Sequence, residues 1–233
     1  MAEDSKGLLA WQTGDLGELA FKRLCIQEGL HCSKLEPDRT GKDFLVEWPP
    51  ETDSERHSYD KRPAPRRCFV QVKATGNDKP QVRLKLSAAE WLAKEDTPAF
   101  VIAPVFGGND VDHYLAFHIR GEALSAILIR LREAQRDGQQ LAQTTVTLPS
   151  KVGVQFPANG DGLRGYFETE IGHNILAYCQ QKQHERSLAG FGEPHAVSMK
   201  VSFEVTDLAH IVECMLGERE LEAELGQLHE TRF

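Results

Sequence analysis

Asp43, Gln71 and Lys73 have the residue types and the spacing that metal-dependent chemistry on a phosphate needs. Asp43 opens the segment DFLVEW, and Gln71 and Lys73 lie two residues apart in CFVQVKA. Alternation along a strand places Gln71 and Lys73 on one face, and Asp43 can reach that face if the two strands pair as a hairpin. The Asp43 carboxylate, the Gln71 amide oxygen and the Val72 backbone carbonyl are hard oxygen donors of the kind that Mg²⁺ prefers. A bound metal would activate a water, and Lys73 would orient it or stabilise charge on the phosphate, so the pattern predicts phosphodiester hydrolysis.

Each of these residues also has an interpretation without chemistry. Asp43 could cap a turn at the start of its strand, and Asp38 in the preceding loop is a competing acid. Gln71 and Lys73 could form the solvated face of an edge strand. At the level of sequence these alternatives stay open.

Hydrophobic periodicity and turn residues predict the elements that position these residues. A helix over about 16–28 carries Glu18, and the polar segment 51–66 separates the two strands as a long loop. Ser87 and Glu90 predict a capping box at the start of a helix that runs to about residue 94. The remaining predicted elements of this part are a strand at 82–86, a buried strand at 99–106, its hairpin partner at 114–119, a helix at 121–135 and a strand at 144–148. This order predicts a mixed α/β domain.

The signals weaken after Pro149, so the sequence divides into residues 1–149 and a C-terminal extension, 150–233. Within the extension, residues 171–183 indicate a helix and residues 197–205 a strand, and Asp207 caps a final long acidic helix. We expect an α/β extension that serves partner binding or oligomerisation.

The charge of the chain is unevenly distributed. A net charge of −8 over 233 residues argues against a protein that holds nucleic acid by bulk electrostatics alone. A basic stretch over 61–85 nevertheless surrounds the CFVQVKA segment, and a local basic surface can meet phosphates. The residues predicted to contact nucleic acid are Arg66, Arg67, Lys79, Arg83 and Lys85. From residue 207 onward acidic residues dominate, which favours a protein partner there.

Other composition features narrow the class of protein. The five cysteines form no CxxC pair, which indicates a cytoplasmic chain without structural zinc. No apolar run approaches the roughly 18 residues that a membrane span needs, so we expect no membrane partner. The nine histidines show no metal-ligand spacing and are interpreted as surface residues or satisfied core residues.

The segments GELAFKRL, GKDF and VQVKA resemble the PD-(D/E)xK nuclease superfamily, and especially its Mrr-like restriction endonuclease branch. That branch has an early helical Glu, an Asp at a strand start and an (E/Q)-V-K motif. Its pattern falls here on Glu18, Asp43, Gln71, Val72 and Lys73. The resemblance covers about the first 150 residues and extends to small domains found beside bacterial antiphage defence genes.

The resemblance implies a restriction-endonuclease-like core, in which helices flank a central mixed sheet. It also implies an endonuclease of bacterial antiphage defence that cleaves DNA with Mg²⁺ or Mn²⁺. Asp43, Gln71 and the Val72 carbonyl would bind the metal, Glu18 would support it, and Lys73 would assist the attacking water. Gln71 stands where many members have Glu, which removes one negative charge and implies weaker metal binding or more reliance on Glu18.

Alternatives to this function remain at the level of sequence. A catalytically silent protein of the same fold could act as an interaction or regulatory subunit of a defence complex. A Holliday-junction or RNA-processing nuclease is a third class, because a fold does not fix a function. Glu18 could simply pair with Lys22 one helical turn later. Many nucleases of this kind act as dimers, so a homodimer is consistent with the resemblance.

Overall fold

The computed structural model describes residues 10–36, 41–49, 65–76, 81–189, 198–202 and 224–229. The chain forms two compact units, Met1–Gly190 and Phe191–Phe233. In the second unit, β10 (Ser198–Ser202) pairs antiparallel with β11 (Glu224–His229).

The first unit carries the remaining helices and strands. Its helices are α1 (Ala10–Gln27), α2 (Leu86–Lys94), α3 (Gly121–Arg136), α4 (Leu163–Ile171) and α5 (Ile175–Leu188), with the short 3₁₀ helix η2 (Ser150–Val152). Its strands are β1 (His31–Lys34), β2 (Phe44–Glu47), β3 (Arg67–Val72), β4 (Thr75–Gly76), β5 (Arg83–Lys85), β6 (Ala99–Gly107), β7 (Asp110–His118), β8 (Thr145–Thr147) and β9 (Val154–Pro157). None of the helices in the described ranges has the length and apolarity that crossing a bilayer requires.

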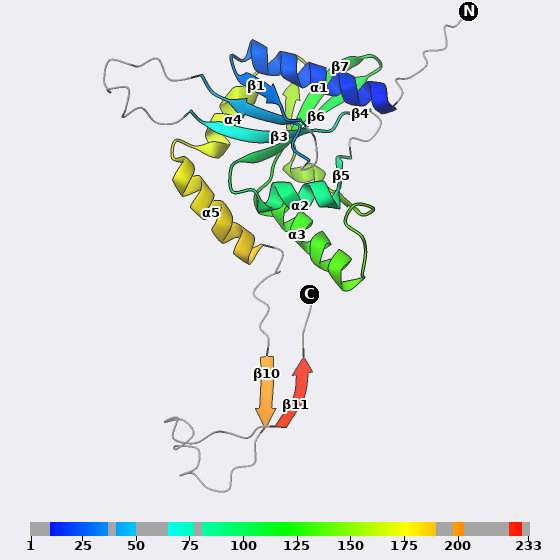
Figure 1. The fold of residues 1–233 in the computed structure, drawn as a ribbon, viewed down its shortest axis with the longest axis vertical. Coiled ribbons are helices and arrows are strands. Elements are labelled where there is room, and N and C mark those ends of the chain that lie inside the picture. The colour runs from blue at the N-terminus through cyan, green and yellow to red at the C-terminus, as the bar shows by residue number, and fades with distance from the viewer. Residues whose placement is uncertain are drawn as a thin grey trace, which may run out of the picture. The chain divides into compact units, whose positions relative to one another are not determined.

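The main sheet has the strand order β1-β2-β3-β6-β7-β9, and β4 also pairs with β6. The β3–β6 pair is parallel, whereas β1–β2, β2–β3, β6–β7 and β7–β9 are antiparallel. Strands β5 and β8 form a separate two-stranded sheet. Helix α1 lies on one side of the main sheet and helices α2 and α3 lie on the other (Figure 1).

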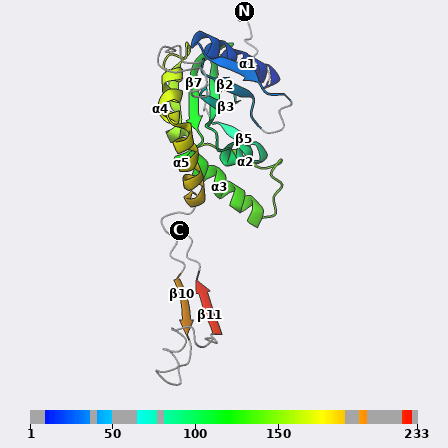
Figure 2. The same ribbon diagram turned by 60° about the vertical axis from the view of Figure 1, so that its left-hand side comes forward.

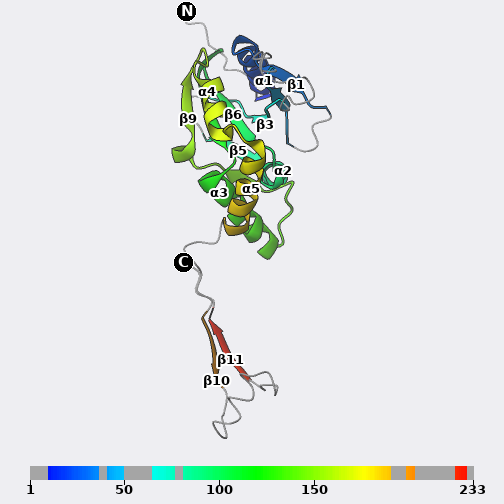
Figure 3. The same ribbon diagram turned by 90° about the vertical axis from the view of Figure 1, so that its left-hand side faces the viewer.

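Side chains from the two faces of the sheet form two apolar clusters. On the face that we call the α1 face, Phe44, Val70 and Phe100 pack with Phe21 of α1 and Phe167 of α4. On the opposite face, which we call the α2 face, side chains of β6 and β7 pack with helices α2 and α3. Views turned about the vertical axis show α5 running beside α2 and α3 (Figures 2 and 3). The prediction of a mixed α/β domain with helices flanking a central sheet is therefore confirmed.

The capping box predicted at Ser87 is wrong. Helix α2 begins at Leu86, and no side chain caps its N-terminus. The carbonyl of Thr144 accepts the N–H of Leu86 at 2.8 Å, and the carbonyl of Leu141 accepts the N–H of Ser87 at 3.3 Å. Carbonyls of a loop that is distant in the sequence thus bond the first N–H groups of the helix, which begins one residue before the predicted cap.

The helix expected over 171–183 is found as α5, but it begins at Ile175 and not at Ile171. Ile171 is the last residue of α4, the chain turns at Gly172 (φ +71°), and Asn174 caps α5 by accepting the N–H of Ala177. The acidic helix expected from Asp207 is wrong over 224–229, where pairing with β10 outweighs helix propensity. Residues 207–223 lie outside the described residues.

The first compact unit extends well beyond Pro149, to Gly190. Strand β9 completes the main sheet, with Phe156 opposite Tyr114 of β7. Leu163 and Phe167 of α4 are fully buried in the cluster on the α1 face. The segment that follows the sequence-based boundary is thus part of the same core.

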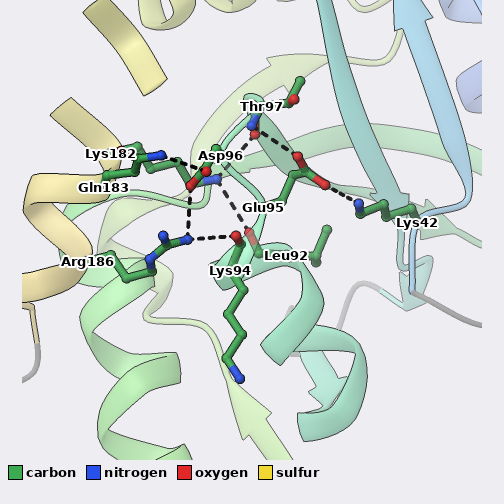
Figure 4. A network of polar contacts seen from close by, with 9 residues as sticks. All are labelled: Lys42, Leu92, Lys94, Glu95, Asp96, Thr97, Lys182, Gln183 and Arg186. Carbon is green, nitrogen blue, oxygen red and sulfur yellow. Dashed lines mark hydrogen bonds and ion pairs between the residues drawn. The ribbon is translucent and has the colours of Figure 1, made fainter. Parts of the chain in front are cut away.

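Lys182 of α5 is fully buried against the C-terminal end of α2 (Figure 4). Its ammonium donates to the carbonyls of Leu92 and Thr97, each at 3.4 Å. Arg186 of the same helix donates to the carbonyl of Lys94 at 2.6 Å. Cations favour the negative end of a helix dipole, so α5 supplies the C-terminal capping groups of α2.

The titration of Lys182 is expected to make stability depend on pH. Burial lowers the pKa of Lys182 to about 8, although nearby Glu95 and Asp96 favour the charged form. Between pH 8 and the usual value of 10.5 the unfolded chain therefore binds more protons than the folded chain. The free energy of unfolding should rise over this window, by up to about 3 kcal/mol, relative to a Lys182→Met variant. Urea denaturation of both proteins across the window measures this difference, and parallel curves would contradict it.

His118 is a buried histidine with a hydrogen-bonding partner at each ring nitrogen, which is one of the two interpretations that the sequence allowed for the histidines. Its Nδ1 lies 2.7 Å from a carboxylate oxygen of Glu170, and its Nε2 lies 2.6 Å from the hydroxyl of Tyr178. Its ring stacks on Phe100 at a centroid distance of 4.5 Å. Burial lowers the pKa of His118 and outweighs the opposing effect of Glu170. Both ring nitrogens are occupied, so this cluster fastens α4 and α5 to the end of β7.

Candidate functional site

Asp43 lies just before β2, where its backbone and side chain both bind neighbouring strands. Its N–H donates to the carbonyl of Val70 at 3.0 Å, and its carbonyl accepts the N–H of Leu35 at 2.9 Å. Its Oδ2 accepts the backbone N–H of Val72 at 2.6 Å. The residue is 7% exposed, so its carboxylate lies in the sheet at the C-terminal end of β3. The antiparallel pairing of β2 and β3 that the sequence analysis required is confirmed.

Gln71 is the most unusual polar residue of this region. It lies opposite Val101 of β6, and its side chain belongs to the α2 face. The residue is only 3% exposed, and within the described part of the chain no donor bonds its side-chain oxygen. An unpaired buried amide oxygen costs about 1–3 kcal/mol, so a water, a metal or another donor at this position would be stabilising.

Lys73 follows β3 and presents an exposed side chain. Its backbone N–H still bonds the carbonyl of Ile102 at 2.9 Å, so the backbone beneath the side chain is fixed. Alternation places Lys73 on the same side of the chain as Gln71. The structure therefore brings Asp43, Gln71, Val72 and Lys73 to one end of β3.

A short loop that the sequence analysis did not single out positions Asp43. Gly41 has φ +65°, and a Cβ on it would lie 2.3 Å from the Cβ of Ala88 in α2. Lys42 forms an ion pair with Glu95 (Figure 4). Its ammonium also lies 4.1 Å from the ring centre of Phe69. Burial opposes ionisation of Glu95, but hydrogen bonds from Lys42 and Thr97 hold its pKa below the usual value. Contacts with α2 and with the loop after it thus hold the residues next to Asp43.

Glu18 is placed differently from the expectation. It forms an ion pair of 2.8 Å with Lys34 of β1, rather than with Lys22 on its own helix. Helix α1 lies on the α1 face, where Gly17 approaches Ala74 so closely that a Cβ would lie 2.6 Å from the Ala74 Cβ. Helix α1, which carries Glu18, therefore covers the face of the sheet opposite the Gln71 side chain, and Lys34 feels the charges of both Glu18 and Asp43.

Lys34 is a site neighbour that sequence reasoning missed. The hydrogen bond to Glu18 raises the pKa of Lys34, and the charges of Glu18, Glu36 and Asp43 add to the effect. Its strand partner is Phe44, the residue after Asp43. Lys34 precedes the DFLVEW segment in the sequence, but its position beside Asp43 depends on the pairing of β1 with β2. That pairing is a tertiary feature, which the sequence pattern did not predict.

The predicted nucleic-acid contacts occupy separate places. Arg67 begins β3, and six residues of strand, about 20 Å, separate it from Lys73. Arg66 lies next to it, with its Nη2 3.4 Å from His173. Arg83 and Lys85 are exposed on β5, which is outside the main sheet. Lys79 lies outside the described residues. Neighbours of Lys73 in the sequence are thus spread over more than one surface.

The oxygen donors at the end of β3 fit a weakly held Mg²⁺ or Mn²⁺. They comprise the Asp43 carboxylate, the Gln71 amide oxygen and the Val72 carbonyl, all hard ligands. Across the described ranges no group of three or more His, Cys, Asp or Glu side chains could hold a metal ion. Mg²⁺ typically keeps several waters and takes one or two carboxylates together with substrate phosphates, which this set allows.

Comparisons of the chain with models of protein families, with curated proteins and with solved structures return no match.

Proposed function

We propose that this chain is a metal-dependent nuclease that hydrolyses DNA phosphodiester bonds at the C-terminal end of β3. The observation that carries the proposal is the Gln71 side-chain oxygen, which is buried beside Asp43 with no donor from the described residues. A buried oxygen without a hydrogen-bond donor destabilises the fold, and a ligand bound to this oxygen would offset that cost. The resemblance of GKDF and VQVKA to PD-(D/E)xK nucleases supports the same residues.

The roles of the side chains follow from their positions. Asp43 and Gln71 would hold the metal, and the hydrogen bond from the Val72 N–H fixes the carboxylate of Asp43. A bound Mg²⁺ supplies a Lewis acid for the phosphoryl oxygen and a water of lowered pKa. Lys73 reaches solvent from a fixed backbone, so its ammonium can contact a phosphate oxygen and stabilise developing charge.

The donor set also predicts how metal and substrate depend on each other. One carboxylate and two neutral oxygens neutralise little of the charge of a divalent cation. A phosphate group adds the missing negative charge, so metal binding is expected to be weak alone and tighter with DNA present. In bacterial defence, this coupling would confine activity to the moment when DNA occupies the site.

Cleavage of supercoiled plasmid in Mg²⁺ or Mn²⁺, with EDTA as the metal-free control, tests the proposal. Lys73→Gln should lower the cleavage rate about 100-fold or more, because it removes the cation but leaves the folded backbone intact. Asp43→Asn should have a comparable effect, and its amide oxygen can still accept the Val72 N–H. Lys151→Gln is the matched control, since this lysine is 72% exposed and its substitution makes the same charge change.

The pattern of results decides between the interpretations. Loss of cleavage in EDTA and in both site variants, with Lys151→Gln unaffected, supports the proposal. Cleavage that survives Lys73→Gln and Asp43→Asn would contradict it. Linear duplex, single-stranded DNA and RNA substrates in the same assay separate a DNA endonuclease from a junction-resolving or RNA-processing enzyme.

One observation favours a second candidate, a catalytically silent interaction subunit of a defence complex. The Asp43 Oδ2 already bonds the Val72 N–H, and this contact would stabilise the strand end without any metal. Such a protein would gain no stability from Mg²⁺ or Mn²⁺, whereas binding to the folded state must raise it. Thermal unfolding with and without metal, in the presence of a nonhydrolysable DNA, distinguishes the two.

A further inference from the structure

Three cysteines of the first unit lie around one point between α1 and the sheet. Cys32 of β1 lies opposite Val46 of β2, which in turn lies opposite Cys68 of β3. Residues that lie opposite each other share a face of a sheet, so Cys32 and Cys68 are in one row. Cys25 of α1 is fully buried in the cluster that covers this face.

Cys32 packs against the apolar cluster on the α1 face that contains Cys25, within reach of a hydrogen bond between the two side chains, and both thiols are free. The turn that connects α1 to β1 is closed by a hydrogen bond in which the N–H of Leu30 donates to the Cys25 carbonyl at 2.8 Å. Formation of a disulfide requires the two sulfur atoms to move from hydrogen-bond contact to about 2 Å.

We propose that Cys25 and Cys32 form a peroxide-sensitive pair that closes to a disulfide between α1 and β1. Cys32 is partly exposed, whereas Cys25 and Cys68 are 0% exposed, so an oxidant meets Cys32 first. This proposal does not depend on the nuclease proposal, because it uses none of the residues at the end of β3.

The electrostatics of the pair assign the two roles. The hydrogen bond from Cys25, aided by the charge of Lys22, lowers the pKa of Cys32 against the opposing effect of burial. The same hydrogen bond, together with burial and the charge on Cys32, raises the pKa of Cys25. Because the thiolate is the nucleophile, Cys32 is the residue that attacks the oxidant.

The reaction balances with a hydroperoxide as the oxidant. The Cys32 thiolate attacks one peroxide oxygen, the O–O bond breaks, and hydroxide leaves and is protonated to water, giving a sulfenic acid. The sulfenic acid carries no charge, so one cause of the raised Cys25 pKa disappears. The Cys25 sulfur then attacks the Cys32 sulfur, the S–O bond breaks, and the thiol proton leaves with hydroxide as water.

The experiment treats the full chain with a modest excess of hydrogen peroxide. The fifth cysteine, Cys214, lies outside the described residues and is replaced throughout by Cys214→Ser, so that it cannot react. Peptide mapping under non-reducing conditions should show one cross-link, Cys25 to Cys32, that dithiothreitol reverses. The loss of the Cys32 thiol should be at least about threefold faster than that of Cys179, whose pKa is raised by burial. Cys179 serves as the internal control, because it is also partly exposed.

Variants test the assignment without depending on one substitution. Cys25→Ala should leave a Cys32 sulfenic acid that dimedone traps, whereas Cys68→Ser should leave the cross-link unchanged. Three outcomes would each overturn the proposal. They are equal oxidation of Cys32 and Cys179, a cross-link to Cys68, and a wild-type chain that keeps both thiols after Cys179 has reacted.

Discussion

Gln71→Glu is expected to make the stability of this protein strongly dependent on a divalent metal. The substituted residue would place a carboxylate in a position that is 3% exposed. Without metal, a buried charge lacking a partner is expected to cost about 3 kcal/mol in the free energy of unfolding. With Mn²⁺, the second carboxylate beside Asp43 should bind the cation at least about tenfold more tightly than the wild-type amide does.

Chemical denaturation in EDTA and in Mn²⁺ measures both effects on the same protein. At a metal concentration of about 100 times the dissociation constant, binding to the folded state adds about 2.7 kcal/mol, so most of the lost stability should return. Gln71→Leu is the control, because it removes the oxygen and should show no response to metal. A Gln71→Glu protein that is destabilised equally in EDTA and in Mn²⁺ would show that no metal site exists at this end of β3.

Gly41→Ala is expected to destabilise the fold and to displace Asp43. The added methyl group would lie 2.3 Å from the Cβ and 2.8 Å from the Cα of Ala88, and the backbone would keep φ +65°. A left-handed conformation alone costs about 1–2 kcal/mol for a residue with a side chain. Because the contact with α2 adds to this strain, we expect a loss of about 3 kcal/mol or more in the free energy of unfolding.

A double-mutant cycle with Ala88→Gly separates the two causes. Removing the Ala88 methyl group relieves the closest contact but leaves the backbone strain and the approach to the Cα, so it should restore only part of the stability. Gly108→Ala is a matched control, since Gly108 has φ +77° but a Cβ added to it would meet nothing within 4 Å. If the two alanine variants lose equal stability, the loop does not rest on α2 as the structure indicates.

Local patterns predicted much of the fold. The apolar segment AFVIAPVF and the GGND turn after it become β6 and β7, which pair antiparallel. The helix over 121–135 is found as α3. Both depend on residues near each other in the sequence, where periodicity carries the information. The grouping of Gln71 and Lys73 follows from the same alternation.

Features that depend on tertiary contacts could not be predicted. The ion pair of Glu18 with Lys34 requires α1 to lie over β1, and no spacing rule for helices anticipates it. Likewise, the Ser87 hydroxyl was expected to cap a helix whose first N–H groups are instead bonded by the distant loop that contains Leu141 and Thr144. The hydrogen-bonding partners of a backbone group can come from anywhere in the chain, and sequence analysis considers only the nearest ones.

The capping of α2 by α5 has a consequence for how the protein is made. Lys182 lies 90 residues after Leu92, whose carbonyl it binds. A ribosome adds about 5–20 residues per second, so the end of α2 leaves the exit tunnel roughly 5–20 seconds before its capping groups do. During that interval the nascent chain has an incomplete first unit and apolar surface for chaperones to bind. Messages truncated before codon 182 should therefore yield chains that proteases remove.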